Sequence, residues 1–396
     1  MKREKTILAI ILLAVMTGCG GVNKQTTDDF IIVDVSKSYP KKELILQDFM
    51  DVEYILLETN DEFLNQGFVR AIGKNHIIVM NQIRDGAIFV YDRSGKAIRK
   101  INRMGQGGEE YTSISGIILD EENNEMFVSD PTKILIYDLY GKYVRSIKPK
   151  DGSRYNARYS FNKENLICYD RSFDYDEEMT ERTPFVIISK KDGSITNEIQ
   201  IIVQQKRPPQ TRIERNGIII VGYVSNFTGT SIVPCQNSWI LTNYSNDTVF
   251  RYLPNHQLIP FMVRTPSIQS GRTPEAYLSL GILTELYYFL RTEKAEPEVR
   301  GSTAEMIFPT TDLLFDRQEK AIYEYSVYND DYIKKITVNM SRTAINDEIA
   351  FWQKIEAYAL IDAYKNGELK DGKLKEIAAK LDAEDNPVIM LVKHKK

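Results

Sequence analysis

The chain has 396 residues, of which 42% are hydrophobic, 27% are charged and 10% are aromatic. This length and aromatic content exclude a disordered or low-complexity protein and allow one large folded core or two ordinary ones. The formal net charge is −4 and no basic stripe occurs, which argues against nucleic acid as a partner.

The N-terminus has the pattern of a secretory signal. Residues 2–5 hold three basic side chains and precede an apolar run over residues 6–16. Because this run is shorter than the ~20 residues that a membrane-spanning helix needs, residues 1–18 are predicted to be a cleaved signal peptide. Two small residues followed by Cys19 resemble the lipobox of bacterial lipoproteins, in which the cysteine is acylated, although Met16 stands where that family usually has Leu. Ordinary secretion with an incidental cysteine is the alternative.

Residues 19–29 are predicted to be a polar, lipidated tether, and residues 30–396 a single folded domain. Two or three acyl chains would anchor the protein firmly, whereas one chain anchors only marginally. Surface-exported lipoproteins of the Bacteroidota have acidic residues directly after the cysteine, and here the first acidic pair comes late, at residues 28–29. The sequence therefore favours an outer-membrane lipoprotein of the cell envelope that faces the periplasm.

The body of the chain contains a repeat. A phrase with the pattern Tyr-Asp-x-x-Gly-Lys runs over residues 88–101 and returns over 134–147, and a looser copy occupies 185–199. The turn glycines are Gly95, Gly141 and Gly193, spaced 46 and 52 residues apart. Each copy predicts a β-hairpin whose glycine takes a positive φ. Further strand pairs precede the hairpins, and four short strands per repeat are the unit of a β-propeller blade. A β-sandwich is the alternative, but it predicts no recurring phrase.

Helical periodicity appears late in this β-rich chain. Apolar residues over 346–366 recur close to every 3.6 positions and the pattern resumes over 374–381, so a helical insertion is expected at about 346–382. Residues 275–290 are a second candidate helix, since Pro274 suits a first helical turn. We interpret the late insertion as packing, with a lid or a partner surface as the alternatives.

Several phrases together resemble the six-bladed β-propeller lipoproteins of gut Bacteroidota, which are related in architecture to NHL-repeat propellers. These phrases are residues 52–59, the two Tyr-Asp-x-x-Gly-Lys hairpins, and residues 104–111, 246–250 and 385–391. The resemblance implies an all-β, six-bladed propeller in the cell envelope and no settled reaction. Gly108 departs from it, because the family usually has Pro there, which loosens the loop. The resemblance also suggests that residues 31–35 and 387–392 pair in one blade and close the ring.

Residues that could carry chemistry are sparse. The acidic run over 173–182 could hold Ca²⁺ but lacks the spacing of an EF-hand, so a solvated loop is the preferred interpretation. Cys168 and Cys235 are expected to be buried free thiols rather than a disulfide. Only His76 and His256 lie in the body of the chain away from its end, and no CxxC or HxxxH pattern occurs. We therefore predict no metal and no cofactor, and no catalytic residues can be assigned.

Three arginines are the candidate ligand-binding residues. Propellers bind ligands at the mouth of the central channel, which is lined by the first strand of each blade. Arg70, Arg158 and Arg212 lie near the starts of three candidate first strands. If they converge they form a funnel for an anionic ligand in an otherwise acidic protein. The alternative is that each faces a different direction.

These observations predict a non-catalytic envelope lipoprotein whose propeller binds a glycan, a peptide or another envelope protein, and whose membrane contact is its lipid anchor. A propeller lyase or hydrolase that acts on sugars or lactones is the alternative. A third possibility is the extracytoplasmic part of a nutrient-sensing or uptake assembly. Enzyme propellers gather His, Asp and Glu at the channel mouth, so a cluster of three or more such residues there would favour the enzyme.

Overall fold

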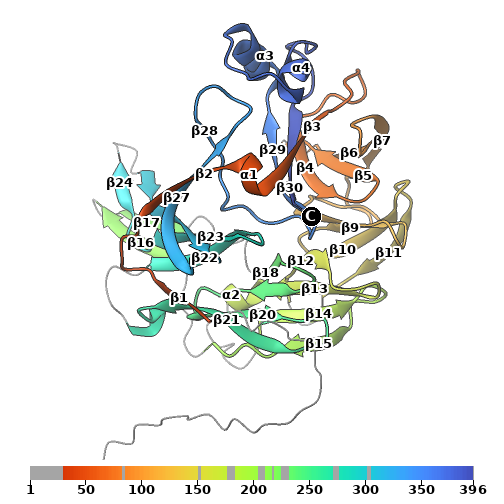
Figure 1. The fold of residues 1–396 in the computed structure, drawn as a ribbon. Coiled ribbons are helices and arrows are strands. Elements are labelled where there is room, and N and C mark those ends of the chain that lie inside the picture. Colours follow the sequence, from red (N-terminus) through yellow and green to blue (C-terminus); the bar gives the residue numbers. More distant parts are fainter. Residues whose placement is uncertain are drawn as a thin grey trace, which may run out of the picture.

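Six β-sheets surround a common axis in the computed structural model, and each sheet is one blade of a propeller (Figure 1). The structure describes residues 30–82, 85–149, 153–175, 183–203, 210–215, 218–223, 232–270, 276–300 and 305–395. The predicted six-bladed, all-β fold is confirmed. The predicted signal peptide and tether, including Cys19, lie outside the described residues.

The first three blades each contain four antiparallel strands in chain order, with the first strand innermost. Blade 1 consists of β4 (Phe68–Ile72), β5 (His76–Met80), β6 (Ala87–Asp92) and β7 (Ala97–Asn102). Blade 2 consists of β8 (Gly116–Asp120), β9 (Glu125–Ser129), β10 (Ile134–Asp138) and β11 (Tyr143–Ile147). Blade 3 consists of β12 (Tyr155–Ser160), β13 (Asn165–Asp170), β14 (Phe185–Ser189) and β15 (Ile195–Ile199), with the short helix α2 (Ser172–Tyr175) after β13.

The last three blades also recruit strands from the N-terminus. Blade 4 consists of β18 (Ile232–Pro234), β19 (Trp239–Leu241), β20 (Thr248–Tyr252), β21 (Leu258–Thr265) and β1 (Ile31–Asp34). Blade 5 consists of β22 (Ala276–Leu283), β23 (Tyr287–Lys294), β26 (Thr310–Asp316), β27 (Ala321–Asn329) and β2 (Lys41–Ile45), and the short β28 (Ile336–Thr337) pairs with β27. Blade 6 consists of β29 (Ile349–Ile355), β30 (Val388–His394) and β3 (Met50–Leu56).

In the described part of the chain, two hairpins and, besides α2, four short helical segments lie outside these sheets. The hairpins are β16 (Gln210–Arg215) with β17 (Ile218–Tyr223), and β24 (Glu298–Arg300) with β25 (Glu305–Ile307). The helical segments are α1 (Leu46–Phe49), the 3₁₀ turn Ile268–Ser270, α3 (Ala357–Lys365) and α4 (Lys373–Ala378). Among the described residues, no helix has the length and apolarity needed to cross a membrane.

The predicted repeat is the outer hairpin of blades 1, 2 and 3. Its turn glycines, Gly95, Gly141 and Gly193, have φ values of 90°, 85° and 76°. In blade 4 the same turn position is held by His256, and the corresponding turn of blade 5 contains Lys320, both with positive φ. A Cβ on any of the three glycines would lie within 3 Å of an atom in the outermost strand of the preceding blade. The turns therefore dock each blade against the one before it.

The ring is closed by β3. β30 lies between β29 and β3, and all seven residues of β3 pair with β30 in an antiparallel ladder. The C-terminal strand pairs with an N-terminal strand as expected, but that strand is β3 and not residues 31–35. β1 has only four residues and pairs in parallel with β21 instead, where Ile31 and Val33 enter the core between blades 4 and 5.

The expected helices are confirmed only in part. Within residues 346–382 the structure contains α3 and α4, but the first portion is β29, the innermost strand of blade 6. The helix expected over residues 275–290 is wrong, because β22 and the first part of β23 form within that range. Residues 349–351 of β29 and 280–283 of β22 are buried in unbroken succession. Burial on both faces removes the alternation that distinguishes a strand from a helix.

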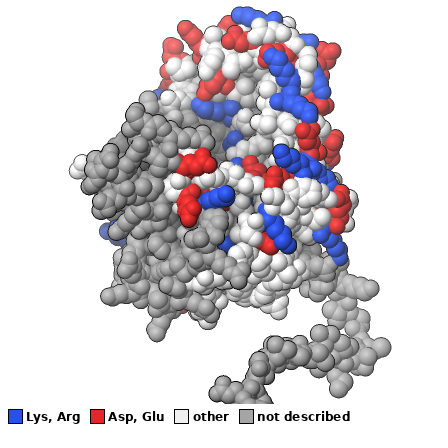
Figure 2. Space-filling view, turned by 90° about the vertical axis from the view of Figure 1, so that its left-hand side faces the viewer, with Lys and Arg blue, Asp and Glu red and all other residues white. Residues whose placement is uncertain are grey.

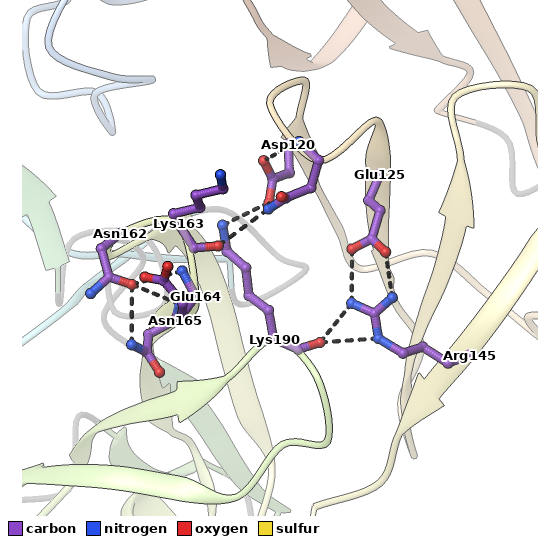
Figure 3. A network of polar contacts seen from close by, with 9 residues as sticks. Asp120, Glu125, Arg145, Asn162, Lys163, Glu164, Asn165 and Lys190 are labelled. Atoms are coloured by element: carbon purple, nitrogen blue, oxygen red, sulfur yellow. Dashed lines mark hydrogen bonds and ion pairs between the residues drawn. The ribbon is translucent and has the colours of Figure 1, made fainter.

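Neighbouring blades are also joined by polar contacts, of which the clearest links blades 2 and 3 (Figure 3). The Lys190 ammonium donates to Asp120 at 2.7 Å, and both side chains are about 6–7% exposed. Beside them, Arg145 binds Glu125 with two hydrogen bonds and also donates to the Lys190 carbonyl. The buried charges of Lys190 and Asp120 therefore compensate each other across the blade boundary, whereas Arg145 and Glu125 pair within blade 2. On the face in Figure 2, acidic and basic side chains are interleaved over the described surface.

Candidate functional site

A cavity of about 670 Å³ opens at the centre of the propeller, where the innermost strands meet. β29, β4, β8 and β12 contact one another in that order around the axis. Residues from each of these strands, from blade 4 and from the segment before β29 line the cavity. The lining residues are 69–72, 115–119, 159–161, 234, 237, 239, 341–347, 351 and 352. The site is therefore built on the rigid centre of the fold.

The segment over residues 339–347, which we call the crossing segment, leads from blade 5 to blade 6 along the cavity. The Ile282 amide in blade 5 donates to the Met340 carbonyl at 3.0 Å. The Tyr159 hydroxyl in blade 3 donates to the Ala344 carbonyl at 2.6 Å, and the Asn346 side chain donates to the Ile72 carbonyl of blade 1 at 3.2 Å. One connection thus bonds to three different blades, which fixes its position against the channel.

Aromatic side chains form much of the cavity wall. Trp239 and Trp352 both line it, and they are the only two tryptophans in the chain. The Trp239 ring packs against Tyr159 and Phe161, with ring centroids 5.4 and 6.4 Å apart. Both tryptophans remain partly exposed. Neither tryptophan could be assigned to the cavity from the sequence, because a single tryptophan in a β-rich segment does not show which way its ring faces.

The three candidate arginines lie in different settings. Arg70 is exposed and lines the cavity from β4, at a bulge where the pairing with β5 shifts register between Val69 and Ala71. Arg158 lies at the corresponding bulge of β12, but its side chain is outside the described part of the structure. A bulge redirects a side chain, which explains how a residue of a buried strand reaches the cavity.

Arg212 does not share this position. It lies in β16, opposite Val221 of β17, in a hairpin that is separate from the six blades. The expectation that all three arginines belong to first strands is therefore wrong for Arg212. The sequence was misleading here because the hairpin has the same short β-rich pattern as a blade strand.

Another arginine, Arg342, belongs to the cavity and was missed. It lies in the crossing segment and is partly buried. Its Nε donates to the Asn339 carbonyl at 3.2 Å and its Nη1 to the Trp352 carbonyl at 3.3 Å. Burial disfavours the charged guanidinium and lowers the pKa of Arg342 below its ordinary value. Among the lining residues, Asp347 is the one carboxylate, and it is exposed at the end of the crossing segment.

The two cysteines and two histidines considered in the sequence lie in surroundings typical of residues that stabilise the fold. Cys168 and Cys235 are buried free thiols, as predicted, and burial raises the pKa of Cys168. His76 bonds to Glu121 at 2.7 Å across the boundary between blades 1 and 2. His256 bonds to the Tyr252 hydroxyl at 2.6 Å within its turn. These four thiol and imidazole environments are thus explained by packing and hydrogen bonding within and between blades.

Of the acidic run over residues 173–182, residues 176–182 lie outside the described part of the structure. Within the part of the chain that is described, no group of three or more His, Cys, Asp or Glu side chains is arranged to hold a metal ion.

Comparison with known proteins places these features in a wider context. A family model described as a 6-bladed beta-propeller, DUF5128, matches residues 21–351. The solved structure of a candidate exported protein from Bacteroides fragilis is similar, with a TM-score of 0.55 and 16% identity over 92% of this chain and 100% of that chain. Virginiamycin B lyase from Staphylococcus aureus aligns with a TM-score of 0.36 and 12% identity over 70% of this chain and 88% of that chain. No curated protein matches the sequence. The first of these structural likenesses shows the fold and no activity.

Proposed function

The chain belongs to the DUF5128 family of six-bladed β-propellers, and we propose that it is an envelope lipoprotein whose propeller binds a ligand in the channel cavity without catalysis. The basic, apolar and small-residue pattern that ends at Cys19 supports an outer-membrane anchor with the propeller facing the periplasm. The similar Bacteroides fragilis protein is described as a candidate exported protein, which supports export of this chain too.

The composition of the cavity wall carries this proposal. Aromatic faces from Trp239 and Trp352 stand beside hydroxyl and amide groups, an arrangement typical of sites that bury an organic ligand and orient it with a few polar contacts. The Ser, Thr and Asn residues of the lining are Ser115, Ser160, Asn237, Ser341, Thr343 and Asn346. A volume of about 670 Å³ suits a small molecule or the end of a glycan. A glycan is therefore favoured over a folded envelope protein as the occupant.

Intrinsic fluorescence provides the test, because both tryptophans of the chain line the cavity. Residues 20–396 are titrated with neutral and acidic oligosaccharides and with short peptides, and melting temperature is followed in parallel. We expect a ligand that changes tryptophan emission and raises the melting temperature. Trp239→Ala should weaken that binding at least tenfold. Tyr358→Ala, which removes a 60% exposed aromatic ring on α3, is the matched control and should leave binding unchanged.

Two outcomes contradict the proposal. A ligand whose affinity is the same for wild type and for Trp239→Ala binds elsewhere on the molecule. A complete absence of binding across the three ligand classes, with a folded protein, removes the cavity as a ligand site.

A further inference from the structure

Arg342 is a partly buried cation whose bonding partners are all neutral. Its Nε and Nη1 donate to the carbonyls of Asn339 and Trp352, and its Nη2 donates to the Gln353 side-chain oxygen at 3.5 Å. Its guanidinium carbon lies 5.5 Å from the centre of the Phe351 ring. Within the described structure no carboxylate forms an ion pair with it. The positive charge is therefore held by dipoles and by a ring face alone.

Two other partly buried arginines of this chain are paired with carboxylates. Arg145 forms two hydrogen bonds with Glu125, and Arg291 forms two with Asp312. A buried charge is costly unless an opposite charge compensates it. Arg342 is consequently the place in the cavity where an added anion would gain most.

The guanidinium has donors left for such an anion. It carries five N–H groups, and the structure engages three of them, one on each nitrogen. One N–H on each terminal nitrogen remains, and a carboxylate can accept two such bonds at once. The lining residues include a single carboxylate, Asp347, which is exposed at the end of the crossing segment. The field in the cavity therefore favours an anionic ligand.

We propose that the ligand of the channel cavity is an acidic saccharide whose carboxylate binds Arg342 while its sugar ring packs against the tryptophans. Sugar rings present apolar C–H faces and hydroxyl edges, which match an aromatic wall interspersed with hydroxyl and amide side chains. This inference rests on the proposed function, because it names the ligand class of the same cavity.

The test compares tetragalacturonate with its fully methyl-esterified form, which keeps the sugar and removes the charge. Affinities are measured by tryptophan fluorescence on residues 20–396 in wild type, Arg342→Gln and Lys37→Met. The last variant removes one positive charge from a 68% exposed side chain that is not among the cavity's lining residues. We expect wild type and Lys37→Met to bind the acid at least tenfold more tightly than the ester. In Arg342→Gln the two forms should bind equally.

Other results of these binding measurements would contradict the ligand class, the role of Arg342 or both. Equal affinity of wild type for acid and ester refutes the anionic ligand class and leaves the proposed binding function intact. A preference for the acid that persists in folded Arg342→Gln refutes the role of Arg342. If neither form binds, the acidic-saccharide inference fails, and the proposed function fails as well only if the wider ligand titration is also negative. Should Arg342→Gln not fold, Arg342→Lys keeps the charge but loses the paired donors, and its preference should fall below that of wild type.

Discussion

Replacing the turn glycines by alanine tests whether these turns dock successive blades. Gly95 has a φ of 90°, and a Cβ there would lie 2.1 Å from the carbonyl oxygen of Leu56, a backbone atom of the ring-closing strand β3. Gly141 has a φ of 85°, but the atoms nearest to its added Cβ belong to the side chain of Ile101, at 2.9 to 3.2 Å. A side chain can rotate away, whereas the Leu56 carbonyl cannot move without shifting blade 6.

The expected costs follow from these two contributions. A left-handed backbone costs a residue with a Cβ about 1–2 kcal/mol, and overpacking a well-packed contact costs about 1–3 kcal/mol more. Gly141→Ala should therefore lose about 1–2 kcal/mol of unfolding free energy, and Gly95→Ala about 2–5 kcal/mol. Gly108 is the control, since its φ lies outside the left-handed region and its Cβ would meet no atom within 4 Å. Gly108→Ala should be neutral or stabilise by up to about 1 kcal/mol.

Urea unfolding followed by circular dichroism measures the three free energies. The order of destabilisation should be Gly95→Ala, then Gly141→Ala, then Gly108→Ala. Equal losses for the first two variants would mean that backbone strain accounts for everything and that the contact with β3 contributes nothing. A loss at Gly95 no larger than that at Gly108 would refute the docking of the turn altogether.

Two further substitutions test the blade boundary and the anchor. Lys190→Met leaves the buried Asp120 carboxylate without its 2.7 Å partner and should cost about 3–5 kcal/mol of unfolding free energy. The double variant with Asp120→Asn should cost less than the sum of the two single changes. Strictly additive losses in urea unfolding would contradict an interaction between the two side chains. Cys19→Ala should release the full-length protein into the soluble periplasmic fraction with an unchanged melting curve, and retention on membranes after a salt wash would exclude the lipid anchor.

The outer hairpins could be predicted because their determinants are local. The Asp92 carboxylate accepts hydrogen bonds from the amides of Ser94 and Lys96, at 2.8 and 3.0 Å. The carboxylate of Asp138 makes the corresponding pair of bonds in blade 2, both at 2.9 Å. These turn residues define the same geometry wherever they occur. In blade 4, His256 replaces the glycine, so the recurring phrase disappears although the turn remains.

The cavity could not be predicted in this way, because its residues are placed by tertiary contacts. Arg342 and the rest of the crossing segment are positioned by bonds to blades 1, 3 and 5, none of which leaves a pattern in the segment itself. Arg70 reaches the cavity through a bulge, and a register shift depends on the partner strand. Arg212 had the right residue type in a strand of similar composition, but that strand belongs to no blade.

The pairing partners of the N-terminal strands could not be predicted from the sequence either. β1, β2 and β3 are all recognisable as β-rich, yet they extend the outer edges of three successive blades, 4, 5 and 6. Each covers an edge that would otherwise be open to pairing with another chain. In this order the anchored strand and the ring-closing strand are different, because the proposed tether joins the propeller at β1 while the ring is closed by β3. A load on the tether would reach the parallel pairs of β1 with β21 and of β2 with β27 first. The antiparallel ladder that closes the ring is therefore shielded by two other strands from the point of anchorage.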